Sequence, residues 1–151
     1  MDKILFSSMF DGWRTPDELF KKLDNEFHFG IDVAADKENA KCPVYITKEE
    51  NALLKDWGGR GAIFCNPPYS RKLGEWVEKA VFEHHRTGET VVLLIPARTD
   101  TKWFHKFVLP YAREIRFIKG RIKFLDRDGK LVNSATFPSM VVIFKQKGGL
   151  F

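Results

Sequence analysis

Residues 90–97 read TVVLLIPA, an unbroken apolar run that is followed by the polar sequence RTDTK. A continuous apolar run of this length is typical of a strand in the middle of a parallel sheet, where both faces are covered. The run therefore predicts a central strand with helices on both sides of the sheet.

Helical and strand patterns alternate on both sides of this run. Apolar spacing predicts helices over residues 16–26, 48–57, 71–86 and 101–109, and strands over residues 29–33, 42–47 and 61–65. The C-terminal third changes rhythm: EIRFIKGRIKFL (114–125) alternates, DRDG (126–129) is a hairpin-turn sequence and PSMVVIFK (138–145) reads as a last strand. This order predicts an open α/β fold, with a mainly parallel sheet and an antiparallel C-terminal edge.

The ends of two predicted helices carry capping signals. Thr15 precedes Pro16 and is predicted to cap the first helix, with the proline at its first position. Asp100 or Thr101 is predicted to cap the helix that follows the central strand.

The length and composition of the chain limit the classes of protein to consider. With 151 residues, residues 1–151 suit a single domain, without a separate large target-recognition domain. The net charge of +5 is compatible with a nucleic-acid partner. Cys42 and Cys65 have no zinc-like companions, so we expect reduced thiols and no metal, and the absence of a long apolar segment predicts a cytoplasmic protein without a membrane anchor.

Polar residues follow several of the predicted strands. Asp32 lies near the end of one, residues 66–69 follow the next, and residues 96–100 follow the central strand. The carboxyl ends of parallel strands meet at one edge of a sheet, and ligands bind there in open α/β folds. We therefore expect these residues to share one crevice.

The sequence NPPYS, residues 66–70, has a chemical interpretation beyond a turn that ends a strand. The amino group of adenine is a poor nucleophile because its lone pair is delocalised into the ring. Asn66 offers one acceptor for an amino N–H, the Pro67 carbonyl offers another, and the rigid backbone of Pro67 and Pro68 holds them in place. Tyr69 offers a ring on which an extracted base could stack. Cys65 is a candidate nucleophile for attack on a cytosine ring carbon, but a small buried residue is the better interpretation.

A wider pattern resembles the small phage-type DNA N6-adenine methyltransferases. It comprises NPPYS together with Trp13-Arg14-Thr15-Pro16, DVAA at 32–35, ARTDTKWFH at 97–105, GRIKF at 120–124 and FPSM at 137–140. The resemblance implies a Rossmann-like, S-adenosylmethionine-dependent domain that methylates a flipped adenine in double-stranded DNA. It also implies a phage enzyme that protects its DNA from host restriction, acting in the host cytoplasm.

The resemblance also implies roles for individual residues. The catalytic set is Asn66, Pro67, Pro68 and Tyr69. The cofactor-binding set is Trp13, Thr15, Pro16, Asp32, Ala34, Asp36 and Asn66. The DNA-binding set is Ser70, Arg71, Arg98, Lys102, Arg121 and Lys123. A core aromatic remains an alternative for Trp13, and a solvated strand face remains one for Arg121 and Lys123.

Other acceptors and one other class of protein remain open at this point. The same motif chemistry serves RNA-adenine and protein-glutamine methylation, because both substrates present a planar NH2 group. A basic DNA-binding module that has lost catalysis is the alternative from another class, and cofactor binding would count against it.

Overall fold

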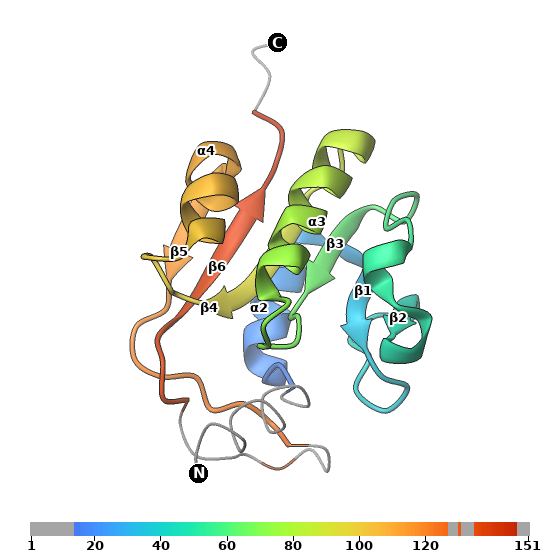
Figure 1. The fold of residues 1–151 in the computed structure, drawn as a ribbon. Coiled ribbons are helices and arrows are strands. Elements are labelled where there is room, and N and C mark those ends of the chain that lie inside the picture. The colour runs from blue at the N-terminus through green and yellow to red at the C-terminus, as the bar shows by residue number, and fades with distance from the viewer. Residues whose placement is uncertain (1–13, 127–129, 131–134, 148–151) are drawn as a thin grey trace.

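The structure, a computed structural model, describes residues 14–126, 130 and 135–147. Its centre is a six-stranded sheet with the order β2-β1-β3-β4-β6-β5 (Figure 1). The strands are β1 (Phe29–Ala35), β2 (Tyr45–Thr47), β3 (Ala62–Cys65), β4 (Val91–Pro96), β5 (Glu114–Phe117) and β6 (Ser139–Phe144).

The pairing of the strands confirms the predicted fold class. β1 pairs in parallel with β2 and β3, and β3 pairs in parallel with β4. β6 is antiparallel to both β4 and β5. The last strand therefore lies one position inside the edge, and β5 forms the edge itself. Every residue of β4 is buried, as the apolar run predicts.

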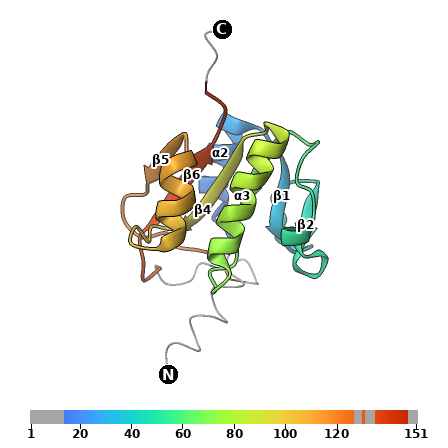
Figure 2. The same ribbon diagram turned by 45° about the horizontal axis from the view of Figure 1, so that its top comes forward.

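Helices cover both faces of the sheet. α2 (Asp17–Phe27) lies on one face, and α3 (Leu73–Thr87) lies on the other beside α4 (Leu109–Tyr111) (Figure 2). Phe20 of α2 packs edge-on against Phe64 of β3, with ring centroids 5.1 Å apart. On the opposite face, α3 turns Val77 and Ala80 into the core, where both are fully buried. The two packed faces hold the strand ends in fixed register.

The predicted helix over residues 48–57 is wrong. The segment instead forms two short 3-10 turns, η1 (Lys48–Glu50) and η2 (Ala52–Leu54). Asn51 between them is in the left-handed region, with φ of 55°, so the two turns cannot join into one helix. Leu54, which helical spacing would place on the apolar face of the predicted helix, is 83 % exposed.

Two helix ends also differ from the prediction. Thr15 does not cap α2, because its hydroxyl accepts a hydrogen bond from Asn66 and α2 has no side-chain cap. Thr101 does act as a cap, since its hydroxyl accepts the N–H of Phe104 at 3.2 Å. The helix that follows contains a π-helical segment, η3 (Phe104–Val108), before it continues as α4.

The tail after β5 keeps its alternation but is not a long strand. β5 ends at Phe117, and beyond it Ile122 and Phe124 are buried while Arg121 and Lys123 are exposed. The prediction that Arg121 and Lys123 lie on a strand is therefore wrong, although both side chains do face solvent. The predicted turn at 126–129 lies largely outside the described residues.

A glycine permits the close approach of the loop before β3. A Cβ built on Gly30 would lie 1.5 Å from the main-chain oxygen of Arg60. Only glycine fits this contact, which brings the loop against β1.

Candidate active site

The candidate site is a groove at the carboxyl ends of β1 and β3. The chain runs from β1 to β2 on one side and then crosses to β3 on the other, so the strand order reverses between β1 and β3. This reversal opens a crevice in α/β sheets. The groove has a volume of about 980 Å³ and is lined by Arg14, by residues 33–36, 38 and 39, by residues 47–49 and 51–53, and by parts of 66–72 with Trp76. A crevice is therefore present at the expected edge of the sheet, but of the residues expected to share it only Asn66, Pro67 and Pro68 line it. Asp32 borders an adjoining recess, and Tyr69 and residues 96–100 do not line the groove.

Asn66 is held at the groove by two hydrogen bonds. Its Nδ2 donates to the hydroxyl of Thr15 at 3.0 Å, and its Oδ1 accepts from the hydroxyl of Tyr69 at 2.8 Å. Thr15 is 3 % exposed, so this contact is shielded from water. Together the two bonds hold the amide in place, with its oxygen accepting from Tyr69. Pro67 and Pro68 line the same groove.

Tyr69 is turned into the protein. Its ring is buried and lies edge-on to Phe124 and Phe137, with centroid separations of 6.0 and 5.6 Å. Its hydroxyl also lies 3.1 Å from the main-chain oxygen of Leu94. Burial raises the pKa of this phenol well above its usual value, so the hydroxyl keeps its proton and remains a donor. In this arrangement the ring does not present a free face to a base.

Asp32 is a buried carboxylate beside the groove. It is 3 % exposed, and its oxygens accept the N–H groups of Ala34 at 3.3 Å and Lys41 at 3.0 Å. Burial raises the pKa of Asp32 to about 6, against the effect of these two donors. Asp32 borders a small polar recess that shares Arg14, Ala34, Asn39 and Asn66 with the groove.

Asp36 shapes the turn that follows β1. Its Oδ1 accepts the N–H groups of Glu38 and Asn39, at 3.0 and 2.9 Å. Its Oδ2 lies 3.6 Å from Arg14 Nη2. Asp36 faces the groove, but part of its hydrogen-bonding capacity is used by the protein itself.

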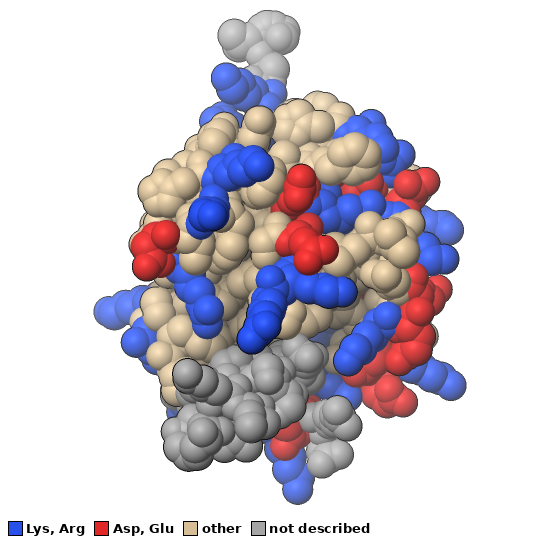
Figure 3. Space-filling view, viewed as in Figure 1, with Lys and Arg blue, Asp and Glu red and all other residues tan. Residues whose placement is uncertain are grey.

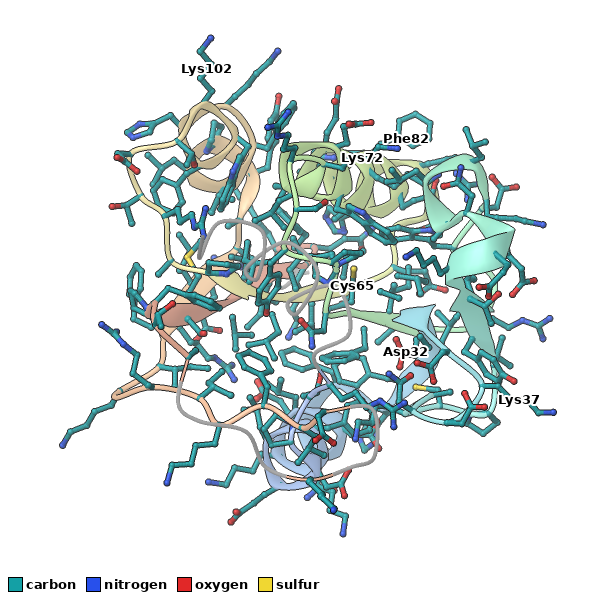
Figure 4. All side chains as sticks on the ribbon, turned by 60° about the horizontal axis from the view of Figure 1, so that its bottom comes forward. Asp32, Lys37, Cys65, Lys72, Phe82 and Lys102 are labelled. Carbon is teal, nitrogen blue, oxygen red and sulfur yellow. The ribbon has the colours of Figure 1, made fainter. Side chains whose placement is uncertain are left out.

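The predicted DNA-binding residues do not form one cluster. Ser70 lines the groove, whereas Arg71 and Arg98 are exposed at the ends of β3 and β4. Lys102 points outward and away from the centre of the molecule, where Cys65 lies (Figure 4). On the face drawn in Figure 3, Lys and Arg side chains are spread out and alternate with acids.

The predicted cofactor residues and the residues that line the groove overlap only in part. Trp13 lies outside the described residues, and Pro16 immediately precedes α2. The sequence analysis gave no role to Arg14, Glu49, Leu53 or Trp76, all of which line the groove. Glu49 could have been found by its position just after β2, since ligands in such folds contact residues that follow strands.

Two expectations about other kinds of site can be compared with the described residues. Both cysteines are free and buried. No described group of His, Cys, Asp or Glu is arranged to hold a metal, and no described helix is long and apolar enough to cross a membrane.

Comparisons with known proteins identify the family. The sequence model of "DNA N-6-adenine-methyltransferase (Dam)" matches residues 4–149. The chain belongs to the Dam family. A DNA N-6-adenine-methyltransferase of Haemophilus phage HP1 is 36% identical over 141 residues, covering 91% of this chain and 80% of the relative. One from Escherichia phage T1 is 29% identical over 153 residues, covering 90% of this chain and 63% of the relative.

Membership in the Dam family gives the groove its chemistry. Dam-family proteins are DNA N6-adenine methyltransferases, and this class of reaction implies S-adenosylmethionine as the methyl donor. The residues present fit such a molecule. The groove is large enough for a nucleoside, and Asp32, Arg14 and Lys41 border a recess of about 10 Å³ that adjoins it.

Proposed function

We propose that this Dam-family protein methylates the N6 atom of an adenine flipped out of double-stranded DNA, at the carboxyl end of β3. The observation that carries the proposal is the fixed amide of Asn66, which is bonded to buried Thr15 and lies at the groove beside Pro67. An amide held this way is a preorganised acceptor for an amino group.

The NPPY residues act by positioning the amino group. Asn66 Oδ1 and the Pro67 carbonyl accept the two N–H groups of adenine, which localises the lone pair on nitrogen. Pro67 and Pro68 restrict the backbone, so little reorganisation is needed when the base arrives. The hydroxyl of Tyr69 occupies Asn66 Oδ1 in this structure, and an adenine N–H takes its place. The surplus proton on nitrogen leaves to solvent, so the step needs no strong base.

The cofactor would lie along the groove. S-adenosylmethionine, when bound, supplies a methyl group made electrophilic by its sulfonium. Asp32 suits its ammonium, because a carboxylate pairs with an ammonium by charge and hydrogen bonding. Asp36 or Glu49 would accept hydrogen bonds from the ribose hydroxyls of the cofactor. The small side chain of Ala34 would leave room for the part of the cofactor that joins its ribose to its amino-acid group. The predicted contacts of Trp13 and Thr15 with the methionine part remain predictions.

The state of Cys65 favours methylation of an amino group over methylation of a cytosine ring carbon. Attack on cytosine C5 needs a cysteine thiolate, but Cys65 is fully buried, and burial raises the pKa of its thiol well above the usual value. Its neighbour Asn66 therefore supplies the chemistry at this strand end.

The basic residues around the groove would hold DNA through its phosphates. Ser70, Arg71 and Arg98 follow the strands that form the crevice, so they suit backbone contacts on either side of a flipped base. Lys102, Arg121 and Lys123 would contact more distant phosphates.

An acceptor competition tests the proposed substrate. The protein is given S-adenosylmethionine with a labelled methyl group and equal amounts of unmethylated duplex DNA, RNA and a glutamine-containing protein. We expect the label on adenine N6 of duplex DNA. Label on RNA or on glutamine would move the substrate to one of the alternatives, whereas cofactor binding without transfer to any acceptor would indicate an inactive DNA-binding module.

We also propose a biological role in protecting phage DNA from host restriction. Both relatives described above come from phages, which supports this role. DNA methylated by the protein should resist endonucleases that cut only unmethylated adenine sites. Unchanged digestion of fully methylated DNA by a panel of such enzymes would contradict the role.

A further inference from the structure

Arg14 is a buried cation with too few partners. Its side chain is 11 % exposed, and its ion pair within the described residues is with Asp36, at 3.6 Å. Its Nε is buried and has no hydrogen-bond acceptor among the described residues. A guanidinium carries five N–H donors, and burying them unpaired is costly. Such a group in a folded protein calls for a functional explanation.

The main chain holds Arg14 in place. Its N–H donates to the Leu125 oxygen at 2.9 Å, and the Leu125 N–H donates back at 3.0 Å. Thr15, the next residue, is fixed by its contact with Asn66. The backbone from which the cation extends is therefore fixed beside the site.

The surroundings of Arg14 indicate the kind of ligand that it could bind. Arg14 borders both the groove and the small recess, and Asp32 and Lys41 border the same recess. Lys41 is paired with Asp17, whereas the Nε of Arg14 has no described acceptor. Each Asp32 oxygen accepts one N–H, so each retains a lone pair for another donor. An anionic and a cationic side chain around one recess complement an α-amino acid, whose ammonium and carboxylate are attached to the same carbon.

We propose that Arg14 binds the carboxylate of the amino-acid part of the cofactor, opposite Asp32. This inference rests on the proposed function. A planar guanidinium pairs with a carboxylate through two parallel hydrogen bonds, which would use the unpaired Nε. A DNA phosphate is a poorer candidate, because a duplex cannot enter a recess in which the cation is almost fully buried.

The test compares two ligands that differ only where Arg14 is proposed to act. S-adenosylhomocysteine carries the amino-acid group, whereas 5′-methylthioadenosine keeps the adenosine and the thioether but lacks that group. Isothermal titration calorimetry measures the affinity of both ligands for the wild type, Arg14→Gln and Arg14→Lys. Lys37→Gln is the matched control, because Lys37 is an exposed cation next to Asp36, the ion-pair partner of Arg14, and does not line the groove.

We expect Arg14→Gln to weaken S-adenosylhomocysteine by about 10- to 100-fold, the usual effect of losing a charge-assisted pair, and 5′-methylthioadenosine by less than about twofold. Arg14→Lys should lose less than Arg14→Gln, and Lys37→Gln should bind both ligands as the wild type does. An equal loss for both ligands would overturn the inference in favour of a role through Asp36 and the fold, and no loss for either would overturn it outright. If the wild type itself bound neither ligand, the proposed function would fail with it.

Discussion

The hydroxyl of Tyr69 and the amino group of a target adenine compete for one acceptor, Asn66 Oδ1. Tyr69→Phe removes the competing donor but keeps the aromatic ring. We expect this variant to lose about 1 kcal/mol of unfolding free energy, because a buried hydrogen bond is lost, and to keep methyl transfer within about tenfold of the wild type. Steady-state methylation and urea unfolding measure the two quantities.

Tyr69→Ala provides the comparison. It also removes the buried ring that packs against Phe124 and Phe137, so we expect it to lose about 3–5 kcal/mol of unfolding free energy and to methylate more slowly than Tyr69→Phe, because Asn66 loses its support. A Tyr69→Phe variant as inactive as Tyr69→Ala would show that the hydroxyl itself is needed for the reaction.

Asp32 carries a pH dependence that opposes the usual one for an acid. The folded-state pKa is about 6 and the ordinary value is 3.8, so the folded protein holds this proton more tightly than the unfolded chain. Its contribution to stability is fully present below the ordinary value and is lost as the pH rises through about 6. A shift of this size corresponds to about 3 kcal/mol at most.

Asp32→Asn should remove this pH dependence. The unfolding free energy of the wild type, measured relative to Asp32→Asn in urea, should fall as the pH is raised from about 5 to about 7. A flat difference across that range would contradict the raised pKa. If the ammonium of S-adenosylhomocysteine pairs with Asp32, it favours the charged carboxylate. Saturating ligand should therefore make this fall in the relative unfolding free energy of the wild type smaller at the higher pH.

The success of the sequence prediction for each element depended on whether local signals matched the tertiary contacts. The strand over residues 90–97 and the helix over residues 71–86 were predicted well, because their apolar side chains follow one period and face one core. The helix over residues 48–57 failed because its helical spacing is a coincidence. Trp57 is buried through its own bonds to Ala52 and Glu83, and not as part of a helical face.

Glu83 of α3 holds the segment that walls the groove. Its fully buried carboxylate accepts the Trp57 N–H at 2.6 Å and pairs with Arg86 at 2.7 Å and Lys79 at 3.3 Å. Trp57 in turn donates to Ala52, which lines the groove. Burial acts to raise the pKa of Glu83, but the donors of Arg86, Trp57 and Lys79 outweigh it and hold the pKa below its ordinary value.

Glu83→Ala should therefore lower the unfolding free energy by about 3 kcal/mol and weaken S-adenosylhomocysteine binding, since it leaves buried donors unpaired and releases the groove wall. The wild type should lose this contribution as the pH falls below the ordinary range of a glutamate. Glu78→Ala, at an exposed position of the same helix, is the control. Equal stability of the two variants in urea would contradict the role of Glu83.

The charge of the whole molecule supplies a test of DNA binding. The net charge is +5, and the face drawn in Figure 3 carries several Lys and Arg side chains, so affinity for DNA should fall as salt rises. We expect Arg71→Ala to make the log–log salt slope shallower by about 1, the effect of one lost phosphate contact, whereas Lys37→Ala leaves it unchanged. Fluorescence anisotropy with a labelled duplex measures both slopes. Equal slopes for the two variants would place Arg71 outside the DNA interface.

The position of the crevice was predictable, but the contacts inside it were not. A parallel sheet brings residues 32–36 and 66–70 to one edge, and the alternation of strand and helix patterns in the sequence indicates such a sheet, although not the order of its strands. The inward position of Tyr69 depends on Phe124 and Phe137, which lie far along the chain. The burial of Arg14 depends in the same way on Asp36 and Leu125, so no local pattern could have revealed it.

The most direct test of the central claim is methyl transfer to duplex DNA by the wild type and by Asn66→Ala, with Lys37→Gln as the surface control. Labelled methyl from S-adenosylmethionine is traced to adenine N6 by nucleoside analysis. The account predicts N6 labelling by the wild type and the control, and a loss of at least about 100-fold in Asn66→Ala, as for removal of a preorganised acceptor or donor at a reacting group. Wild-type levels of labelling by a folded Asn66→Ala variant would contradict it.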